Sequence, residues 1–110
     1  FTGTIMAGAI GLIKNDKFFF DPQAPNVDDY LICGLNAYYF RKCLIDYRFC
    51  AIPKDTFHNT GGLSEYRSLE TEKQDTLYLK RKFGDALTIK KNTAKAKVFH
   101  QYQRTLRIPF

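Results

Sequence analysis

Three cysteines are the residues of this 110-residue chain with the most versatile chemistry. Thiols such as Cys33, Cys43 and Cys50 can form disulfides, hold a metal ion or act as nucleophiles. Neither histidine, His58 or His100, has a cysteine partner near it in the sequence. Three thiols separated by two and three turns of one helix cannot converge on a tetrahedral centre, so we expect no metal site.

Recognisable catalytic motifs are missing from the sequence, which has no nucleophile elbow, phosphate-binding loop or catalytic pair of carboxylates. Gly61-Gly62 indicates a turn, and Asp28-Asp29 is best explained as negative charge at a helix start. Cys43 and His58 are a nominal thiol–base pair, for which a structural role is the better interpretation. We therefore expect neither enzymatic activity nor a cofactor.

A predicted helix from Val27 to Ile52 positions the three cysteines. Asn26 is a suitable N-cap, and Asp28 and Asp29 would place negative charge in the first turn, where it favours a helix. Pro53 and the polar sequence after it predict the end of the helix.

Six residues recur along this predicted helix at steps of three and four, which is the spacing of a stripe on one face. They are Cys33, Asn36, Phe40, Cys43, Tyr47 and Cys50. Leu31 and Leu35 would lie to the sides of this stripe. The three thiols share the stripe, and we predict that they are buried there and either free or linked to a partner. Cys43 and Cys50 would be about 10 Å apart, too far for a disulfide, which tolerates about 7 Å between Cα atoms.

A second helix is predicted from Ser64 to Phe83, with Ser64 or Ser68 as its cap. Glutamates lie early in this segment, Lys80–Lys82 lie late, and Gly84 follows, an order that suits the helix dipole and a glycine C-cap. The segment has little apolar content, so the two helices would share only a thin core.

These elements predict an all-α fold, a small helical hairpin over residues 27–84. An N-terminal arm (1–26) and a basic C-terminal tail (85–110) would extend from it. No stretch approaches the roughly 20 apolar residues of a membrane-spanning helix. A chain of this size can barely bury a core by itself, so we do not expect an independent monomer. Three consecutive aromatic residues, Phe18 to Phe20, cannot all face one way, so some are expected to contact another protein.

The excess positive charge lies entirely in the tail. Residues 1–85 carry eleven basic and eleven acidic residues, whereas residues 86–110 carry six basic residues and no acid. Ala86 to Ile89 and Val98 to Tyr102 are short apolar or alternating patches, which predict an extended tail on a partner subunit or on lipid headgroups. A mitochondrial ribosomal protein is an alternative, but the tail lacks an arginine cluster and no nucleic acid is expected.

One segment resembles a known family. Phe20 to Asn26 (FDPQAPN) is followed by Cys33, Asn36, Phe40 and Cys43. This arrangement is similar to the first half of the cytochrome c oxidase subunit VIb family, in which an F-D-x-R-x-P-N-like segment leads at the same distance into C-x2-N-x3-F-x2-C. The resemblance covers about 25 of the 110 residues.

The resemblance implies a coiled-coil-helix-coiled-coil-helix (CHCH) accessory subunit of the respiratory chain. Such a subunit would lie peripherally on the intermembrane-space side of the mitochondrial inner membrane, in complex IV, without a catalytic role. Cys33 and Cys43 would be the first structural cysteine pair. The family's second helix carries two further cysteines, whereas this chain has none after Cys50.

Partner binding is expected at the segment before the helix, at the aromatic arm and on the helix stripe. The candidates are Phe18, Phe19, Phe20, Asp21, Pro25, Asn26, Asn36 and Phe40. The expected partners are other subunits of a large membrane complex. A CHCH-like subunit of complex I or of ATP synthase is the alternative within the respiratory chain.

Overall fold

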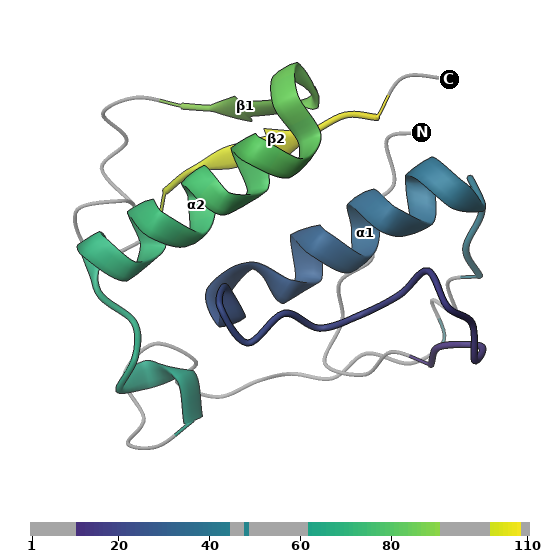
Figure 1. Cartoon of the computed structure of the whole chain (residues 1–110), viewed down its shortest axis with the longest axis horizontal. Helices are drawn as coiled ribbons and strands as arrows, with labels where there is room; N and C mark the ends of the chain where they lie inside the picture. Colours follow the sequence, from purple (N-terminus) through teal and green to yellow (C-terminus); the bar gives the residue numbers. More distant parts are fainter. Residues whose placement is uncertain (1–10, 45–47, 49–61, 91–101, 109–110) are drawn as a thin grey trace.

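Two helices and two short strands form the described part of the computed structural model, which comprises residues 11–44, 48, 62–90 and 102–108. The elements are α1 (Asp28–Tyr39), α2 (Leu69–Phe83), β1 (Leu87–Ile89) and β2 (Arg104–Leu106), with single 3-10 turns at Pro25–Val27, Gly62–Ser64 and Gly84–Ala86. Helices α1 and α2 lie side by side (Figure 1). The predicted helical class is confirmed, and a small sheet is added to it.

Helix α1 ends at Tyr39, far earlier than predicted. The carbonyl oxygen of Asn36 accepts the amide N–H groups of Phe40 and Arg41, both at 2.9 Å. The Asn36 side-chain amide donates to the carbonyl of Lys42 at 2.9 Å, and Arg41 adopts a left-handed φ of 56°. Left-handed residues stop a helix. No glycine or proline marks this stop, so the residue pattern alone did not reveal it.

Two predictions concern the start of α1: the acidic first turn is confirmed, and the Asn26 N-cap is wrong. Asp28 and Asp29 occupy the first turn, as expected. Asn26 is not the N-cap, because the Pro25–Val27 turn carries it into the interior, where its backbone N–H donates to Oδ2 of Asp75 at 3.1 Å. The backbone N–H of Asn26 therefore joins the turn before α1 to α2, and the Asn26 side chain does not cap α1.

Helix α2 follows its sequence signals closely. Ser68, one of the two predicted caps, accepts the N–H of Thr71 at 3.1 Å, and the Thr71 hydroxyl accepts the N–H of Ser68 at 2.8 Å. This reciprocal capping box satisfies two backbone donors and sets the start at Leu69 instead of Ser64. Gly84, with a φ of 54°, follows the last residue as predicted.

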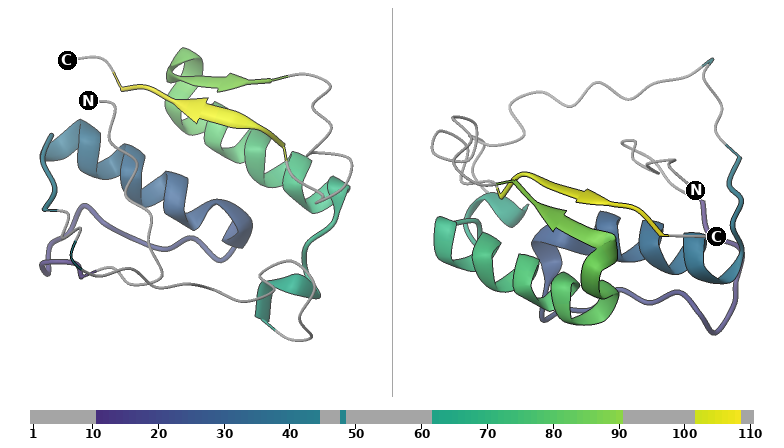
Figure 2. Two further views of the ribbon diagram at one scale, coloured as in Figure 1. Left: turned by 180° about the vertical axis from the view of Figure 1, so that it is seen from behind. Right: turned by 90° about the horizontal axis from the view of Figure 1, so that it is seen from above.

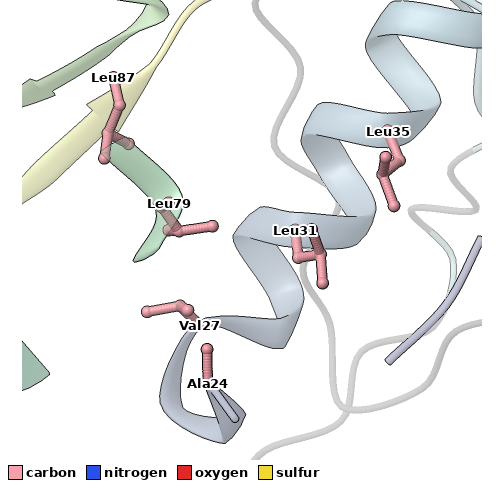
Figure 3. Packing of buried hydrophobic residues seen from close by; sticks show 6 residues of the cluster. All are labelled: Ala24, Val27, Leu31, Leu35, Leu79 and Leu87. Atoms are coloured by element: carbon pink, nitrogen blue, oxygen red, sulfur yellow. The ribbon is translucent and has the colours of Figure 1, made fainter. Parts of the chain in front are cut away.

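The apolar core lies between the first half of α1, the second half of α2 and β1 (Figure 3). Its buried members are Ala24, Val27, Leu31, Leu35, Leu79 and Leu87. Figure 3 shows Leu79 of α2 extending toward α1, with Val27 of the turn before α1 below it. The buried apolar side chains on this side of α1 are thus Leu31 and Leu35, continued by Val27. The predicted stripe through the cysteines is wrong, because the helix stops at Tyr39, before Phe40 and Cys43.

The described parts of the tail pack on this chain. Strand β1 pairs antiparallel with β2, placing Leu87 opposite Leu106 and Ile89 opposite Arg104. Both views in Figure 2 show the strand pair against α2. The expected extended conformation is confirmed at these strands, but they pair with each other, whereas the tail was expected on a partner. Most of the second predicted patch, residues 98–101, lies outside the described residues.

Close approach of the two helices depends on one glycine. A Cβ atom added at Gly34 would overlap the ring of Phe83, which lies over the middle of α1. Gly34 is therefore required by packing, because the ring occupies the space that any larger side chain would fill.

We predict that Gly34→Ala lowers the free energy of unfolding by about 1–3 kcal/mol, the usual effect of overpacking a core. Helix propensity alone would give the opposite sign, a gain of about 1 kcal/mol. Urea unfolding followed by circular dichroism measures the difference. Gly11→Ala, where nothing lies within 4 Å of the added Cβ, is the control. Phe83→Leu should partly rescue Gly34→Ala, and a stabilised single variant would contradict the assigned contact.

Candidate functional site

Four aromatic rings make a continuous row at the C-terminal end of α1. Phe18 from the N-terminal arm meets Phe40 edge-on with centroids 5.3 Å apart, and Phe40 lies 6.4 Å from Tyr39. Tyr39 meets Tyr38 edge-on at 4.9 Å. We call these four residues the aromatic surface. Its outer part is solvent-accessible, with Tyr38 64% exposed, and single-chain proteins rarely expose several large rings together.

The arm residues beside the aromatic surface are divided between exposed and anchored positions. Phe20 is 56% exposed, and Phe19 is exposed with the ammonium of Lys82 4.8 Å from its ring centroid. Asp21, in contrast, accepts the hydroxyl of Tyr78 at 2.6 Å and the backbone N–H of Gln23 at 3.0 Å. The arm is therefore held on α2 at Asp21 while neighbouring rings face outward.

The residues predicted to bind partners thus fall into two groups. Phe19, Phe20 and Phe40 are exposed, as a binding role requires. Four other candidates make contacts inside this chain: Phe18, Asp21, Asn26 and Asn36. Pro25 is half-buried at the start of the 3-10 turn before α1. Tyr38 and Tyr39 were not among the candidates, although two adjacent tyrosines just before a helix end were a usable signal.

The cysteines do not share a face. Cys33 is buried within α1, whereas Cys43 lies beyond the end of the helix and is exposed. The prediction that Cys43 is buried is therefore wrong, because α1 ends before it. The two thiols do not bond to each other. Cys50 lies outside the described residues.

A buried ion-pair cluster lies between α2, β2 and the turn before α1, and sequence reasoning missed it. Glu72 is 1% exposed, and its Oε2 accepts Nη1 of Arg104 at 3.0 Å. Its Oε1 lies 3.4 Å from Nε of Arg67. Nη1 of Arg104 also donates to the hydroxyl of Thr76 and to the carbonyl of Tyr102, both at 3.1 Å.

A second buried carboxylate, Asp75, extends this cluster along α2. It accepts the backbone N–H of Asn26 at 3.1 Å and the hydroxyl of Tyr66 at 3.3 Å. Burial raises the pKa of Asp75, and these two hydrogen bonds oppose the rise. The spacing of Glu72, Asp75, Thr76 and Leu79 puts them on one helix face, but three of the four are polar, so no local signal indicated that this face is buried.

Asp29, in the first turn of α1, lies near the same cluster. Burial raises the pKa of its carboxyl group, while the N–H of Tyr30 and the positive charges of Arg104 and Arg67 oppose the rise. The cluster therefore holds two guanidinium groups and several carboxylates whose charges largely compensate.

Neither a metal centre nor a membrane span is found in the described residues. No group of three or more His, Cys, Asp or Glu side chains is placed to hold a metal there, and both histidines lie outside them. No helix in the described ranges has the length and apolar character to cross a bilayer. The chain matches no protein-family model, and comparison with curated proteins and with solved structures gives no significant match.

Replacing Glu72 with Leu should lower the free energy of unfolding by about 3–5 kcal/mol, because two buried or half-buried arginines lose their counter-charge. Glu70→Gln, at an exposed position of the same helix, is the control and should change little. Adding Arg104→Met to Glu72→Leu should recover much of the loss, because apolar groups then replace the pair. Urea unfolding at neutral pH measures all four chains. A double variant that is no more stable than Glu72→Leu would contradict direct coupling.

The Tyr78–Asp21 bond predicts a specific alkaline dependence of stability. Burial, and then the bond to the Asp21 carboxylate, raise the pKa of Tyr78 to about 12. An unfolded tyrosine titrates near about 10. The stabilisation by the neutral hydroxyl is therefore complete below pH 10 and is lost as the pH rises toward 12.

We expect Tyr78→Phe to cost about 1 kcal/mol at pH 8, the usual value of one hydrogen bond. The difference in free energy of unfolding between Tyr78→Phe and the unchanged chain should shrink between pH 10 and 12, because only the unchanged chain has a hydroxyl group at position 78 that can lose its proton. Chemical unfolding at four pH values in this range tests this, with the exposed Tyr38→Phe as control. A difference that stays constant to pH 12 would show that the bond does not hold the arm.

Proposed function

We propose that this chain is a non-catalytic accessory subunit of a mitochondrial inner-membrane respiratory complex, and that it docks through its aromatic surface. The observation that carries the proposal is the row of exposed, mutually contacting rings at the end of α1. Aromatic side chains bury large areas on binding and dominate interface energetics. The resemblance of residues 20–43 to the oxidase subunit VIb family suggests cytochrome c oxidase, on its intermembrane-space side, as the complex.

The contacts that hold the aromatic surface in place support a docking role. Phe18 meets Phe40 edge-on, Tyr38 meets Tyr39 edge-on, and the arm that contributes Phe18 is bonded to α2 by the Asp21–Tyr78 hydrogen bond of 2.6 Å. Pre-ordered side chains lose less conformational entropy on binding than mobile ones. Lys17 lies 5.7 Å from the ring centroid of Tyr39 and is paired with Asp16 at 2.8 Å, so the rim of the surface is polar.

The proposal does not need the covalent hairpin of the family. Cys33 and Cys43 do not bond to each other, and α1 ends between them. Packing of Leu79 and Leu87 on α1, together with the Glu72–Arg104 pair, takes the place of such a bridge in the described part of the chain.

Binding to ribosomal RNA is a weaker explanation of the basic tail. Phosphate binding needs accessible cations. Arg104, one of the six basic tail residues, has a side chain only 7% exposed and is paired with Glu72. Its charge is therefore used inside the fold.

The test isolates the tagged full chain, in mild detergent, from mitochondria of cells that make it. We expect haem absorbance to co-purify with it and to remain at high salt, because apolar docking is insensitive to ionic strength. Ribosomal RNA that co-purifies at low salt and is released at high salt would overturn the proposal.

In the same experiment, Tyr38→Ser with Tyr39→Ser should reduce the recovered complex. An interface anchor contributes about 2 kcal/mol, or roughly 30-fold in affinity. Leu77→Ser, which also removes an exposed apolar side chain but on α2, is the matched control and should retain binding. Equal losses in both variants would indicate that the aromatic surface is not the interface.

A further inference from the structure

A second group of exposed side chains lies beside the aromatic surface, on the N-terminal arm and on the segment that leaves α1. Three of its members are aliphatic: Ile13 is 88% exposed, Leu44 98% and Leu12 38%. The other two are lysines, Lys14 and Lys42, which are also exposed. We call these five residues the apolar-basic edge, and none of them belongs to the aromatic surface.

Ring contacts bring the two segments of this edge together. Phe18 meets Phe40 with centroids 5.3 Å apart, and the ammonium of Lys17 lies 5.7 Å from the ring centroid of Tyr39. Both views in Figure 2 show the purple arm next to the teal segment that follows α1. The edge is therefore one region of the surface, although its residues come from two parts of the sequence.

Hydrogen bonds order the backbone that carries these side chains. The Asn15 side chain donates to the carbonyl of Ile13 at 2.6 Å and accepts the N–H of Lys17 at 2.8 Å, which forms a local turn. The carbonyl of Lys42 accepts the side-chain amide of Asn36 at 2.9 Å. The exposed aliphatic groups are thus presented by backbone that is held in the fold.

The charge of the edge indicates what covers it. Residues 11–20 and 38–44 together carry four basic residues and one acid, Asp16, which is paired with Lys17. No carboxylate of the described residues is paired with Lys14 or Lys42. An apolar surface with excess positive charge is complementary to an anionic bilayer, where aliphatic side chains enter the acyl boundary and lysines stay among the headgroups.

Other occupants fit this edge less well. Lysine is depleted in protein–protein interfaces, and Ile13 and Leu44 offer no ring on which a nucleic-acid base could stack. We propose that the apolar-basic edge rests on the surface of an anionic lipid bilayer. This role goes beyond docking on a complex and uses none of the rings of the aromatic surface, so either role can fail without the other.

The test is flotation of the full chain with lipid vesicles. We expect binding to vesicles of equal parts phosphatidylcholine and phosphatidylglycerol, weakened by salt, and much less binding to pure phosphatidylcholine. No binding to the anionic vesicles, as for an edge that meets only protein, would overturn the proposal. Equal binding to both kinds of vesicle would overturn it as well.

A first pair of variants separates the edge from the basic tail. Lys14→Gln with Lys42→Gln should weaken binding to the anionic vesicles roughly 30-fold, the usual effect of two lysines near such a surface. Lys73→Gln with Arg81→Gln removes the same charge from exposed positions of α2 and should change binding much less. Equal losses in the two double variants would refute the assignment of the edge.

A second pair tests the aliphatic side chains. Ile13→Ser with Leu44→Ser should weaken binding about tenfold, because less apolar area leaves water. Leu69→Ser with Leu77→Ser, at exposed positions of α2, should retain it. Circular dichroism checks that each variant keeps the fold. Unchanged binding of the Ile13 and Leu44 variant would contradict contact of these side chains with lipid.

Discussion

The carboxylate of Glu72 lies between two arginines, and the elements of this small chain depend on that arrangement. Burying an ion pair costs free energy unless further hydrogen bonds complete it. Here Arg104 also donates to Thr76 and to the carbonyl of Tyr102, and Arg67 approaches the second oxygen of Glu72. The cluster therefore joins the C-terminal strand to α2 and to the turn before α1, beside an apolar cluster that has six buried members among the described residues.

Elements whose ends are marked by local sequence signals could be predicted, whereas those whose ends depend on particular side-chain contacts could not. Helix α2 was predictable because Ser68, its acidic first turn, its basic last turn and Gly84 are local signals. The end of α1 was not, because it results from Asn36 bonding to the backbone after it and from the left-handed Arg41. Either residue would also be acceptable within a helix.

The buried polar residues show the same limit. Glu72 and Asp75 have the composition of a solvated helix face, and their partners Arg104 and Asn26 are distant in sequence. Only the folded arrangement makes them internal. The candidate site was predicted in part: exposed rings at Phe19, Phe20 and Phe40 were expected, whereas the adjacent tyrosines and the buried ion-pair cluster were not. The aromatic surface is at the C-terminal end of α1 and the ion-pair cluster is near its N-terminal end, so one short helix connects an apolar surface to a polar interior.

The central claim is that the C-terminal strand belongs to the folded core because Arg104 anchors it. Native-state hydrogen exchange tests this most directly. The amides of Asn26 and Arg107 donate to Asp75 and to the carbonyl of Ala86, at the two sides of the anchored region. We predict that both exchange with the same free energy as the interior amides of α2, through global unfolding. Exchange of Arg107 orders of magnitude faster than α2 would show that the strand detaches independently, and would contradict the account.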